Sequence, residues 1–396
     1  MTRMAFVWSH TMASQGLEDE YWLTKDDSLM YSLAKMAGEG HVITVAAMTE
    51  KREPRSYERD GYRILLFPVD LTSQPYGSQT SRSLLTHLKQ NPPDILYLNS
   101  LNMVMNRIIL NTIRGSKSVL RAHGKLIHDL LVEDVDVLEV SNEVQRREAT
   151  GTFLIDRESV WINPFGADTT LFAPKPDMAK EFDIVYVGRI VKGKNIELLL
   201  RAFQRVDGKL LLIGKGPHDE YYREVANRLR VGNKTTFHGW VDSSELPDLL
   251  NGCRVFVIPS LSEGGGRAVA EAMACGLPVI AMKGSRGSEA YVEHGKSGFV
   301  VEPSELPGAI CQLLSDEDMQ RKFGSRGHEV CKTNFSSNAF YLRLKKLAES
   351  LESGEYARRP VKRGLAFHFK RLFKSNYLIA RLRKMKTGSF VKRYRA

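Results

Sequence analysis

Two glutamates flank a glycine cluster in the stretch from residue 255 to residue 303. Glu263 precedes three consecutive glycines, and Glu271 follows eight residues after Glu263. Eight residues make a little over two helical turns, so a helix permits both carboxylates on one face, but such pairs are common and mean little alone. A glycine loop that leads into a helix presents backbone N–H groups to an anion. The stretch therefore predicts a binding site for an anionic ligand.

The elements around this loop are a strand before it and a helix and a second strand after it. Residues 255–258 (VFVI) are a short apolar run that stops at a Pro-Ser pair, as a buried strand stops at a turn. Residues 268–275 form a helical run, and Gly276 and Pro278 are its stop signals. Residues 278–282 are the next strand. A strand–loop–helix–strand unit of this kind places the loop and the helix N-terminus against the ligand.

A second glycine loop carries two cations. The strand at residues 184–187 leads into Gly188, Arg189 and, five residues later, Lys194. By pattern this loop is a near-miss P-loop, Gly-x4-Gly-Lys, in which Asn195 stands where a Ser or Thr holds Mg²⁺. No apolar strand ends in the Asp that a nucleotide hydrolase uses for its metal. The pattern therefore disfavours a P-loop nucleotide hydrolase.

The residues from 263 to 279 read EGGGRAVAEAMACGLPV. This stretch closely resembles the donor-site signature of the family 4 retaining glycosyltransferases, the group 1 glycosyl transferases of the GT-B superfamily. The family usually has an aromatic residue between the two loop glycines, where this chain has Gly265. The linker NPFGADTTLFAP at residues 163–174 resembles the family's Pro-x-Gly-x-Asp-x-x-x-Phe-x-Pro hinge. The resemblance covers residues 155–351 well and the first 150 residues mainly by the order of elements. It implies an α/β fold with two Rossmann-like domains that face each other across a cleft.

The resemblance also implies roles for the residues of the first loop. Glu271 is expected to accept hydrogen bonds from the ribose hydroxyls of a nucleotide-sugar donor. Glu263 is expected near the donor sugar, where it orients the sugar hydroxyls or faces the anomeric carbon. The N–H groups around Gly264 and Gly266 would help to hold sugar or phosphate. Gly214 opens a turn that resembles the family's Gly-x-Gly-Pro turn, and the absence of a third glycine at dinucleotide spacing argues against a nicotinamide site.

The cationic loop receives its role from the same resemblance. Arg189 and Lys194 are expected to contact the donor diphosphate, on the loop that Gly188 opens. When the sugar–phosphate bond breaks, negative charge grows on the departing phosphate. Two fixed cations and nearby N–H groups stabilise that charge without a metal ion. We therefore expect no metal site and no cofactor, and we expect a UDP-, GDP- or ADP-sugar as the substrate.

The first half of the chain alternates strands with helices, which predicts a mostly parallel, doubly wound sheet. Ligands of such sheets bind beyond the carboxyl ends of the strands, where Gly16, His10 and His123 fall. The resemblance implies that Gly16 approaches the diphosphate and that His123 lines the reaction centre near the transferred sugar. The alternative for His123 is a histidine at the end of a strand that has no functional role. For His10 we favour this second interpretation. The predicted strands are residues 5–9, 41–48, 62–69, 95–98, 118–122, 135–141 and 159–163, and the predicted helices are residues 28–37, 84–89 and 106–114.

The length of 396 residues and the 42% of apolar residues are sufficient for two domains with separate cores. We expect an N-terminal Rossmann-like acceptor domain at residues 1–165 and a C-terminal Rossmann-like donor domain at residues 166–335. A helix at residues 336–353 is expected to return to the first domain. Residues 354–396 form a basic amphipathic tail.

The positive charge of the chain is concentrated in this tail. Residues 354–396 contain 14 Lys or Arg and one Glu, whereas the rest of the chain, with 43 basic and 45 acidic residues, is nearly neutral. Apolar residues recur in the tail at near-helical spacing, which favours a helix on an anionic membrane surface, where each basic residue adds about 1 kcal/mol. A solvated tail is the bland alternative, and nucleic-acid binding is not expected. Membrane binding would favour a lipid-linked acceptor.

Other patterns limit the class of protein. The four cysteines lie 20 or more residues apart without a CxxC pair, which indicates reduced, mostly buried thiols and no zinc site. No apolar run approaches the length of a membrane span and no apolar signal region begins the chain, so we expect a cytoplasmic protein, which the basic tail would allow to bind peripherally to the cytoplasmic face of the membrane. Asp134 and Asp136 form a lone DxD, the metal motif of a different transferase fold, and such a motif arises easily by chance.

The resemblance, taken with these patterns, implies a metal-independent, retaining glycosyltransferase that moves a sugar from a nucleotide sugar to a hydroxyl of a glycan, a glycolipid or a lipid-linked intermediate. Retention of the anomeric configuration is implied by the resemblance alone. A GT-B sugar-nucleotide epimerase is one alternative, and it would need further acid or base groups in the cleft. A catalytically idle membrane-associated scaffold is the other, and the presence of both glutamates with both cations argues against it.

Overall fold

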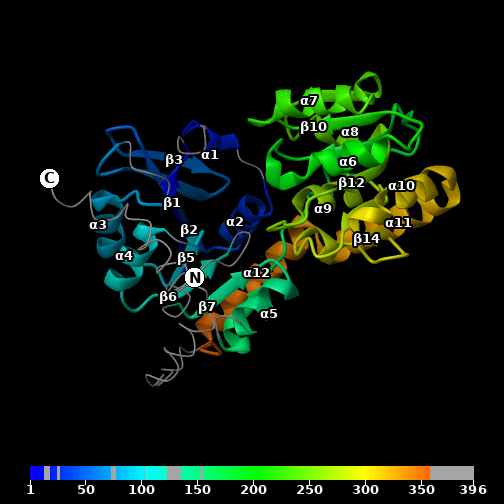
Figure 1. Ribbon diagram of the computed structural model, residues 1–396. Helices are drawn as coiled ribbons and strands as arrows, with labels where there is room; N and C mark the ends of the chain where they lie inside the picture. The colour runs from blue at the N-terminus through cyan, green and yellow to red at the C-terminus, as the bar shows by residue number, and fades with distance from the viewer. Residues whose placement is uncertain are drawn as a thin grey trace.

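The computed structural model of the protein describes residues 1–12, 18–24, 27–72, 77–101, 103–122, 135–151 and 155–356. These residues form two lobes, and each lobe is built around one sheet (Figure 1). The first lobe holds an eight-stranded sheet of order β3-β4-β2-β1-β5-β6-β7-β8, and the second holds a six-stranded sheet of order β11-β10-β9-β12-β13-β14. The predicted architecture of two Rossmann-like halves is confirmed.

The first sheet is parallel except where β3 pairs with β4. Its strands are β1 (Arg3–Thr11), β2 (Val42–Thr49), β3 (Arg55–Arg59), β4 (Tyr62–Pro68), β5 (Ile95–Asn99), β6 (Lys117–Arg121), β7 (Val137–Val140) and β8 (Val160–Ile162). The helices of this lobe are α1 (Tyr21–Thr24), α2 (Ser28–Gly38), α3 (Arg82–Gln90), α4 (Val104–Thr112) and α5 (Glu143–Gly151).

Strand β1 shows why this sheet is doubly wound. After Arg3 it is buried along its whole length, as a parallel strand is when helices cover both faces. Phe6 belongs to one core cluster and Val7 to another, because successive side chains of a strand point to opposite faces. One cluster contains residues of α2, and the other contains residues of α3 and α4.

The second sheet is parallel throughout its paired strands. Its strands are β9 (Phe182–Val187), β10 (Leu210–Ile213), β11 (Thr235–Gly239), β12 (Cys253–Ile258), β13 (Val279–Met282) and β14 (Gly298–Val301). Its helices are α6 (Ile196–Phe203), α7 (Asp219–Arg228), α8 (Leu246–Asn251), α9 (Arg267–Ala274), α10 (Leu306–Ser315) and α11 (Glu317–Asn334). The predicted strand–loop–helix–strand unit is therefore confirmed as β12, the glycine loop (residues 263–266), α9 and β13.

Several elements were not predicted from the sequence: the helices α1, α5, α7, α8, α10 and α11 and the strands β3 and β14. Strand β3 reads RSYER and lies at the edge of the first sheet, where Ser56 and Glu58 face solvent and the apolar signal is weak. Only Gln145 and Ala149 of α5 are buried, so this helix has almost no apolar face. Strand β14 is four residues long and starts at a glycine, so its apolar run is short.

Helix α12 (Ser337–Glu352) returns from the second lobe to the first, as Figure 1 shows in orange. Ser336 caps it by accepting a hydrogen bond from the Ala339 N–H (3.1 Å). Phe340, Leu344, Leu347 and Leu351 are buried, whereas Leu342 is 54% exposed. The buried residues pack into the core cluster that contains the α2 residues. Residues 357–396, most of the basic tail, lie outside the described residues.

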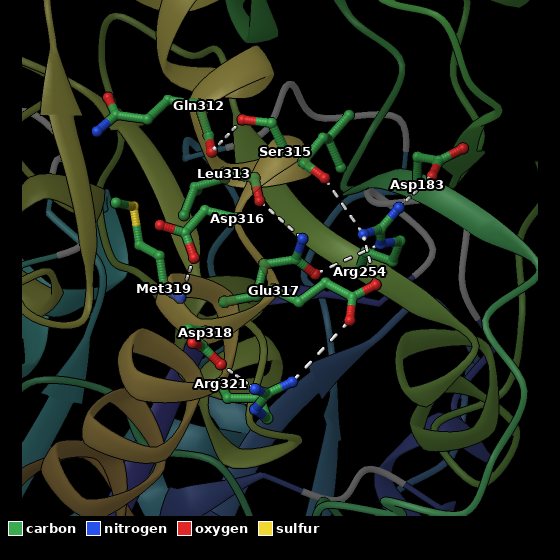
Figure 2. A network of polar contacts seen from close by, with 12 residues as sticks. Asp183, Arg254, Gln312, Leu313, Ser315, Asp316, Glu317, Asp318, Met319 and Arg321 are labelled. Atoms are coloured by element: carbon green, nitrogen blue, oxygen red, sulfur yellow. Dashed lines mark hydrogen bonds and ion pairs between the residues drawn. The ribbon is translucent and has the colours of Figure 1, made fainter.

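A polar network lies at the amino edge of the second sheet, where β9 and β12 begin (Figure 2). Arg254 donates through Nη1 to Asp183 Oδ1 (3.3 Å) and through Nη2 to the Leu314 carbonyl (3.2 Å). Its Nη2 also lies 3.7 Å from Glu317 Oε1. These contacts join the sheet to the junction of α10 and α11. They lie at the end of the strands opposite to the glycine loops, so we assign them to the fold.

The described residues provide two further observations on the predicted class. Cys253, Cys275 and Cys331 are buried free thiols as expected, whereas Cys311 is exposed. Within the described ranges, none of the helices combines the length and the apolarity that a membrane crossing requires.

Candidate functional site

Three loops meet at the carboxyl edge of the second sheet, after β9, β10 and β12. A Cβ added at Gly214, after β10, would lie 2.0 Å from the carbonyl oxygen of Gly188, after β9. Gly214 also has a φ of +137°, so this position favours glycine in two ways. Asn195 donates through Nδ2 to the carbonyl of Pro259, after β12 (3.3 Å). Since parallel strands end at the same edge, the sequence could predict that these loops would be neighbours.

The cationic loop and the glycine loop are joined by an ion pair. Lys194 Nζ lies 2.7 Å from Glu263 Oε1 and 2.6 Å from Oε2. The two side chains are 21% and 10% exposed, so solvent screens this pair only partly. Asn195 has a left-handed backbone (φ +52°) that turns the chain from Lys194 into α6. The sequence placed both partners at the site, but it did not predict that they pair with each other.

Arg189 is the second cation of this edge. Its side chain is exposed, and within the described ranges it forms no ion pair. Its backbone carbonyl accepts a hydrogen bond from the hydroxyl of Tyr186 (3.1 Å), which holds the start of the loop against β9. The guanidinium is therefore available to an anionic ligand, whereas the ammonium of Lys194 is already shared with a carboxylate.

Glu271 lies on the second turn of α9 and is 6% exposed. Arg267 donates through Nε to Glu271 Oε1 (2.9 Å). Burial raises the pKa of the Glu271 carboxyl, and the charge of Arg267 opposes this rise. Glu271 also lines a pocket whose walls come from both lobes and from the segment between them: Asp27, Ser28, Tyr31, Gly166, Ala167, Asp168, Leu171, Phe172, Ser243, Arg267, Glu271 and Ser337. The carboxylate therefore lies at the junction of the lobes and is not sealed beneath the sheet.

The glycine loop is packed closely from several sides. A Cβ at Gly266 would lie 2.4 Å from the ring of Tyr291, and a Cβ at Gly287 would lie 2.8 Å from Glu263 Cβ. The Glu263 N–H donates to the carbonyl of Ser285 (2.7 Å). Side chains therefore have little room at Gly266 and Gly287, and this close packing restrains the backbone that carries Glu263.

The first lobe also reaches this loop. Gln145, on α5, donates through Nε2 to the carbonyl of Gly264 (3.4 Å). Arg286, after β13, pairs through Nη1 with Glu148 Oε2 on α5 (2.9 Å). These contacts could not be predicted from the sequence, because helix α5 is mostly polar and pairs between distant segments leave no mark in local patterns.

Some predicted site residues lie outside the described residues. Gly16 and His123 are among them, so their roles stay predictions. His10 is buried in β1. Asp136 accepts hydrogen bonds from the Ser118 N–H (2.7 Å) and hydroxyl (2.8 Å), which ties the start of β7 to β6. This half of the DxD pair therefore has a structural contact, and Asp134 lies outside the described residues.

The second half of the chain is similar in sequence to known proteins. Residues 168–330 match the family model of "Glycosyl transferases group 1". Over 191 residues the chain is 33% identical to a GDP-mannose-dependent alpha-(1-6)-phosphatidylinositol monomannoside mannosyltransferase of Mycobacterium tuberculosis, with 42% of this chain and 49% of that protein covered. A lipopolysaccharide core biosynthesis glycosyltransferase, LpsE, of Rhizobium meliloti is 30% identical over 168 residues, covering 41% of this chain and 48% of that protein. The chain thus spans about half the length of the curated relatives it matches.

The fold similarity extends further along the chain. The sucrose-phosphate synthase of Thermosynechococcus elongatus superposes with a TM-score of 0.72 at 19% identity and covers 89% of this chain and 100% of that one. These findings support the predicted family and confirm the predicted fold: residues 168–330 match the group 1 glycosyl transferases, and the two lobes have the GT-B fold.

Proposed function

We propose that this protein is a retaining glycosyltransferase that moves a sugar from a nucleotide sugar to a hydroxyl acceptor without a metal ion. The observation that carries the proposal is the meeting of Lys194, Glu263 and the glycine loop at one sheet edge, beside the exposed cation of Arg189. Cations, a carboxylate and close-packed backbone together suit a ligand with both phosphates and hydroxyls. The M. tuberculosis relative, described as GDP-mannose-dependent, supports a nucleotide-sugar donor.

The ion pair between Lys194 and Glu263 gives the binding of the donor a defined order. In the free protein Lys194 is held by Glu263. A diphosphate carries more negative charge than one carboxylate, so on binding it competes with Glu263 for the ammonium. Glu263 then has oxygens available for the hydroxyls of the sugar. Binding of the phosphates and binding of the sugar are thus coupled, because the phosphates release the Glu263 carboxylate that orients the sugar.

Leaving-group stabilisation is assigned to Arg189 and Lys194. Charge that develops on the β-phosphate is stabilised by cations that are already in place, which acts mainly in the transition state. Glu271 is assigned to the ribose. Its Oε1 is held by Arg267, so the carboxylate is oriented before the ribose hydroxyls arrive. Attack by the acceptor hydroxyl on the face that the nucleotide leaves retains the anomeric configuration.

The acceptor belongs to the first lobe in this proposal. We infer a hydroxyl of a glycan, a glycolipid or a lipid-linked intermediate, because the relatives are described as acting on a phosphatidylinositol mannoside and in lipopolysaccharide core synthesis. The roles of Gly16 at the diphosphate and of His123 at the reaction centre remain part of the proposal.

Thermal-shift screening against UDP, GDP and ADP and their common sugar conjugates tests the proposal directly. We expect one base to raise the melting temperature in the presence of EDTA. Turnover of the corresponding sugar nucleotide is then followed with and without EDTA, and NMR of the product reports the anomeric configuration. Failure of every nucleotide to bind, or an inverted product, would contradict the proposal.

A further inference from the structure

The segment that connects the two lobes packs directly on the glycine loop. Phe165 lies in this segment, next to Gly166 and two residues before the bridge between Ala167 and Ser336. A Cβ added at Gly265 would lie 3.2 Å from Phe165 Cδ2 and 4.0 Å from its Cε2. An alanine at 265 would therefore fit only after a small shift, and a larger side chain would overlap the phenyl ring. The space between the backbone of Gly265 and the Phe165 backbone therefore holds one large side chain, and the ring of Phe165 fills it.

The ring of Phe165 is itself held by a buried cation. Arg121 Cζ lies 4.1 Å from the centroid of the Phe165 ring, a distance at which a guanidinium and an aromatic face attract each other. The ring also stacks on Phe340 of α12, with centroids 6.1 Å apart and planes 11° apart. These contacts come from two different elements, β6 and α12, so they fix the plane of the ring.

The position of Arg121 is fixed in turn by polar partners. Its side chain is 1% exposed and pairs with Glu139, which is fully buried. Tyr97 donates to Glu139 Oε2 (2.7 Å), and Arg121 Nη2 donates to the carbonyl of Asn163 (3.3 Å). A buried charge with this many partners has one favourable position, because leaving it would strand a charge in an apolar region. The cluster therefore anchors Phe165 from the side of the first sheet.

A second contact links Phe165 to the next glycine. Tyr291 donates its hydroxyl to the carbonyl of Phe165 (2.9 Å). The same tyrosine ring lies against Gly266, where an added Cβ would be 2.4 Å away. Phe165 thus meets the loop twice, through its ring at Gly265 and through the tyrosine at Gly266.

We propose that Phe165 is a positioning residue for the glycine loop, and that it fixes the backbone from which Glu263 and the loop N–H groups meet the ligand. The ring restrains Gly265 from the side of the first lobe. The hydrogen bond from the Glu263 N–H to Ser285 restrains the loop from the other side. The loop is held between the two lobes, so its conformation depends on a residue that lies outside the matched family region. The identity of the ligand in this proposal rests on the proposed function.

Hydrogen exchange measures the restraint without any ligand. In Phe165→Ala we expect the amides of residues 260–266, that of Glu263 included, to exchange on the order of tenfold faster than in the wild type, because local opening becomes easier. Phe299→Ala is the matched control. It removes a partly buried ring from an aromatic pair in the second lobe (Phe299 and Phe323, centroids 5.3 Å apart) and should leave these amides unchanged. Phe165→Leu provides a milder variant if the alanine variant does not fold.

A compensating pair of substitutions separates positioning from general stability. Gly265→Phe alone should disturb the loop, because its ring needs the space of Phe165. Combining Gly265→Phe with Phe165→Ala places one ring in that space again, and slow exchange of residues 260–266 should return. Equal exchange rates of residues 260–266 in the wild type, Phe165→Ala and Phe165→Leu would overturn the proposal. A double variant in which these amides exchange as fast as in either single variant would also overturn it.

Binding of UDP, GDP and ADP to the same variants keeps the two proposals distinguishable. If one of these nucleotides binds, we expect Phe165→Ala to weaken it and the double variant to recover at least part of the affinity. If the exchange pattern holds while none of the three binds, the positioning role is supported and the proposed function fails. If the nucleotide binds equally to all variants, the positioning role is refuted for ligand binding.

Discussion

The assignment of Glu271 to the donor ribose makes a quantitative prediction for Glu271→Gln. The substitution keeps the shape of the side chain and an oxygen for Arg267, and it removes the negative charge. Hydrogen bonds to a charged group contribute about 1.5 to 3 kcal/mol, which corresponds to roughly a 10- to 150-fold change in affinity. Glu271 is 6% exposed, so water can replace little of the lost interaction. We therefore expect the upper part of this range.

The assay is calorimetric titration with UDP, GDP and ADP, and with the 2′-deoxy form of whichever binds most tightly. The wild type should prefer the ribonucleotide, and Glu271→Gln should lose most of this preference. Glu293→Gln is the matched control, because Glu293 also pairs with an arginine of the second lobe (Arg326 Nε to Oε2, 2.7 Å) but lies at the surface. The control variant Glu293→Gln should bind the ribonucleotide as tightly as the wild type. If Glu271→Gln binds it equally tightly, the ribose assignment is wrong.

Three other substitutions test separate parts of the site. Lys194→Met should weaken binding of the nucleoside diphosphate about tenfold or more and leave binding of the nucleoside unchanged, because it removes the proposed contact with the diphosphate. Titration with both ligands checks this. Arg267→Leu removes the charge that opposes the raised pKa of Glu271. On acidification this variant should therefore lose nucleotide affinity at a higher pH than the wild type does. A pH series of affinities that superposes on that of the wild type would contradict this prediction. Glu139→Gln leaves its buried arginine partner without a counter-ion, and we expect a loss of about 3 to 5 kcal/mol in the free energy of unfolding by urea. A loss below about 1 kcal/mol would show that the pair is not buried as described.

The fold could be predicted from the sequence to a large extent, because strands buried on both faces are continuous apolar runs. Strand β12, the glycine loop and α9 follow from such a run, a glycine cluster and a helix stop at Gly276. Strand β3 and helix α5 could not be predicted in this way, since their residues are mostly polar and their stability comes from neighbours that lie far away in the sequence.

The site could be predicted only in its parts. Glu263 and Lys194 were recognised separately, from two loops 69 residues apart, and their pairing depends on the order of β9 and β12 in the sheet. The role of Phe165 was hidden for a similar reason. It is one residue of a hinge motif, and its contact with Gly265 appears only when both lobes are in place.

The central proposal is that Arg189 and Lys194 neutralise the charge of the diphosphate in place of a divalent ion. The dependence of nucleotide binding on Mg²⁺ and on these two cations tests it most directly. Calorimetry with UDP, GDP and ADP is performed in excess EDTA and in MgCl₂, on the wild type and on Arg189→Ala/Lys194→Ala. We expect equal affinity of the wild type in both buffers and loss of binding in the double variant. Binding that requires Mg²⁺, or a double variant that binds like the wild type in EDTA, would contradict it.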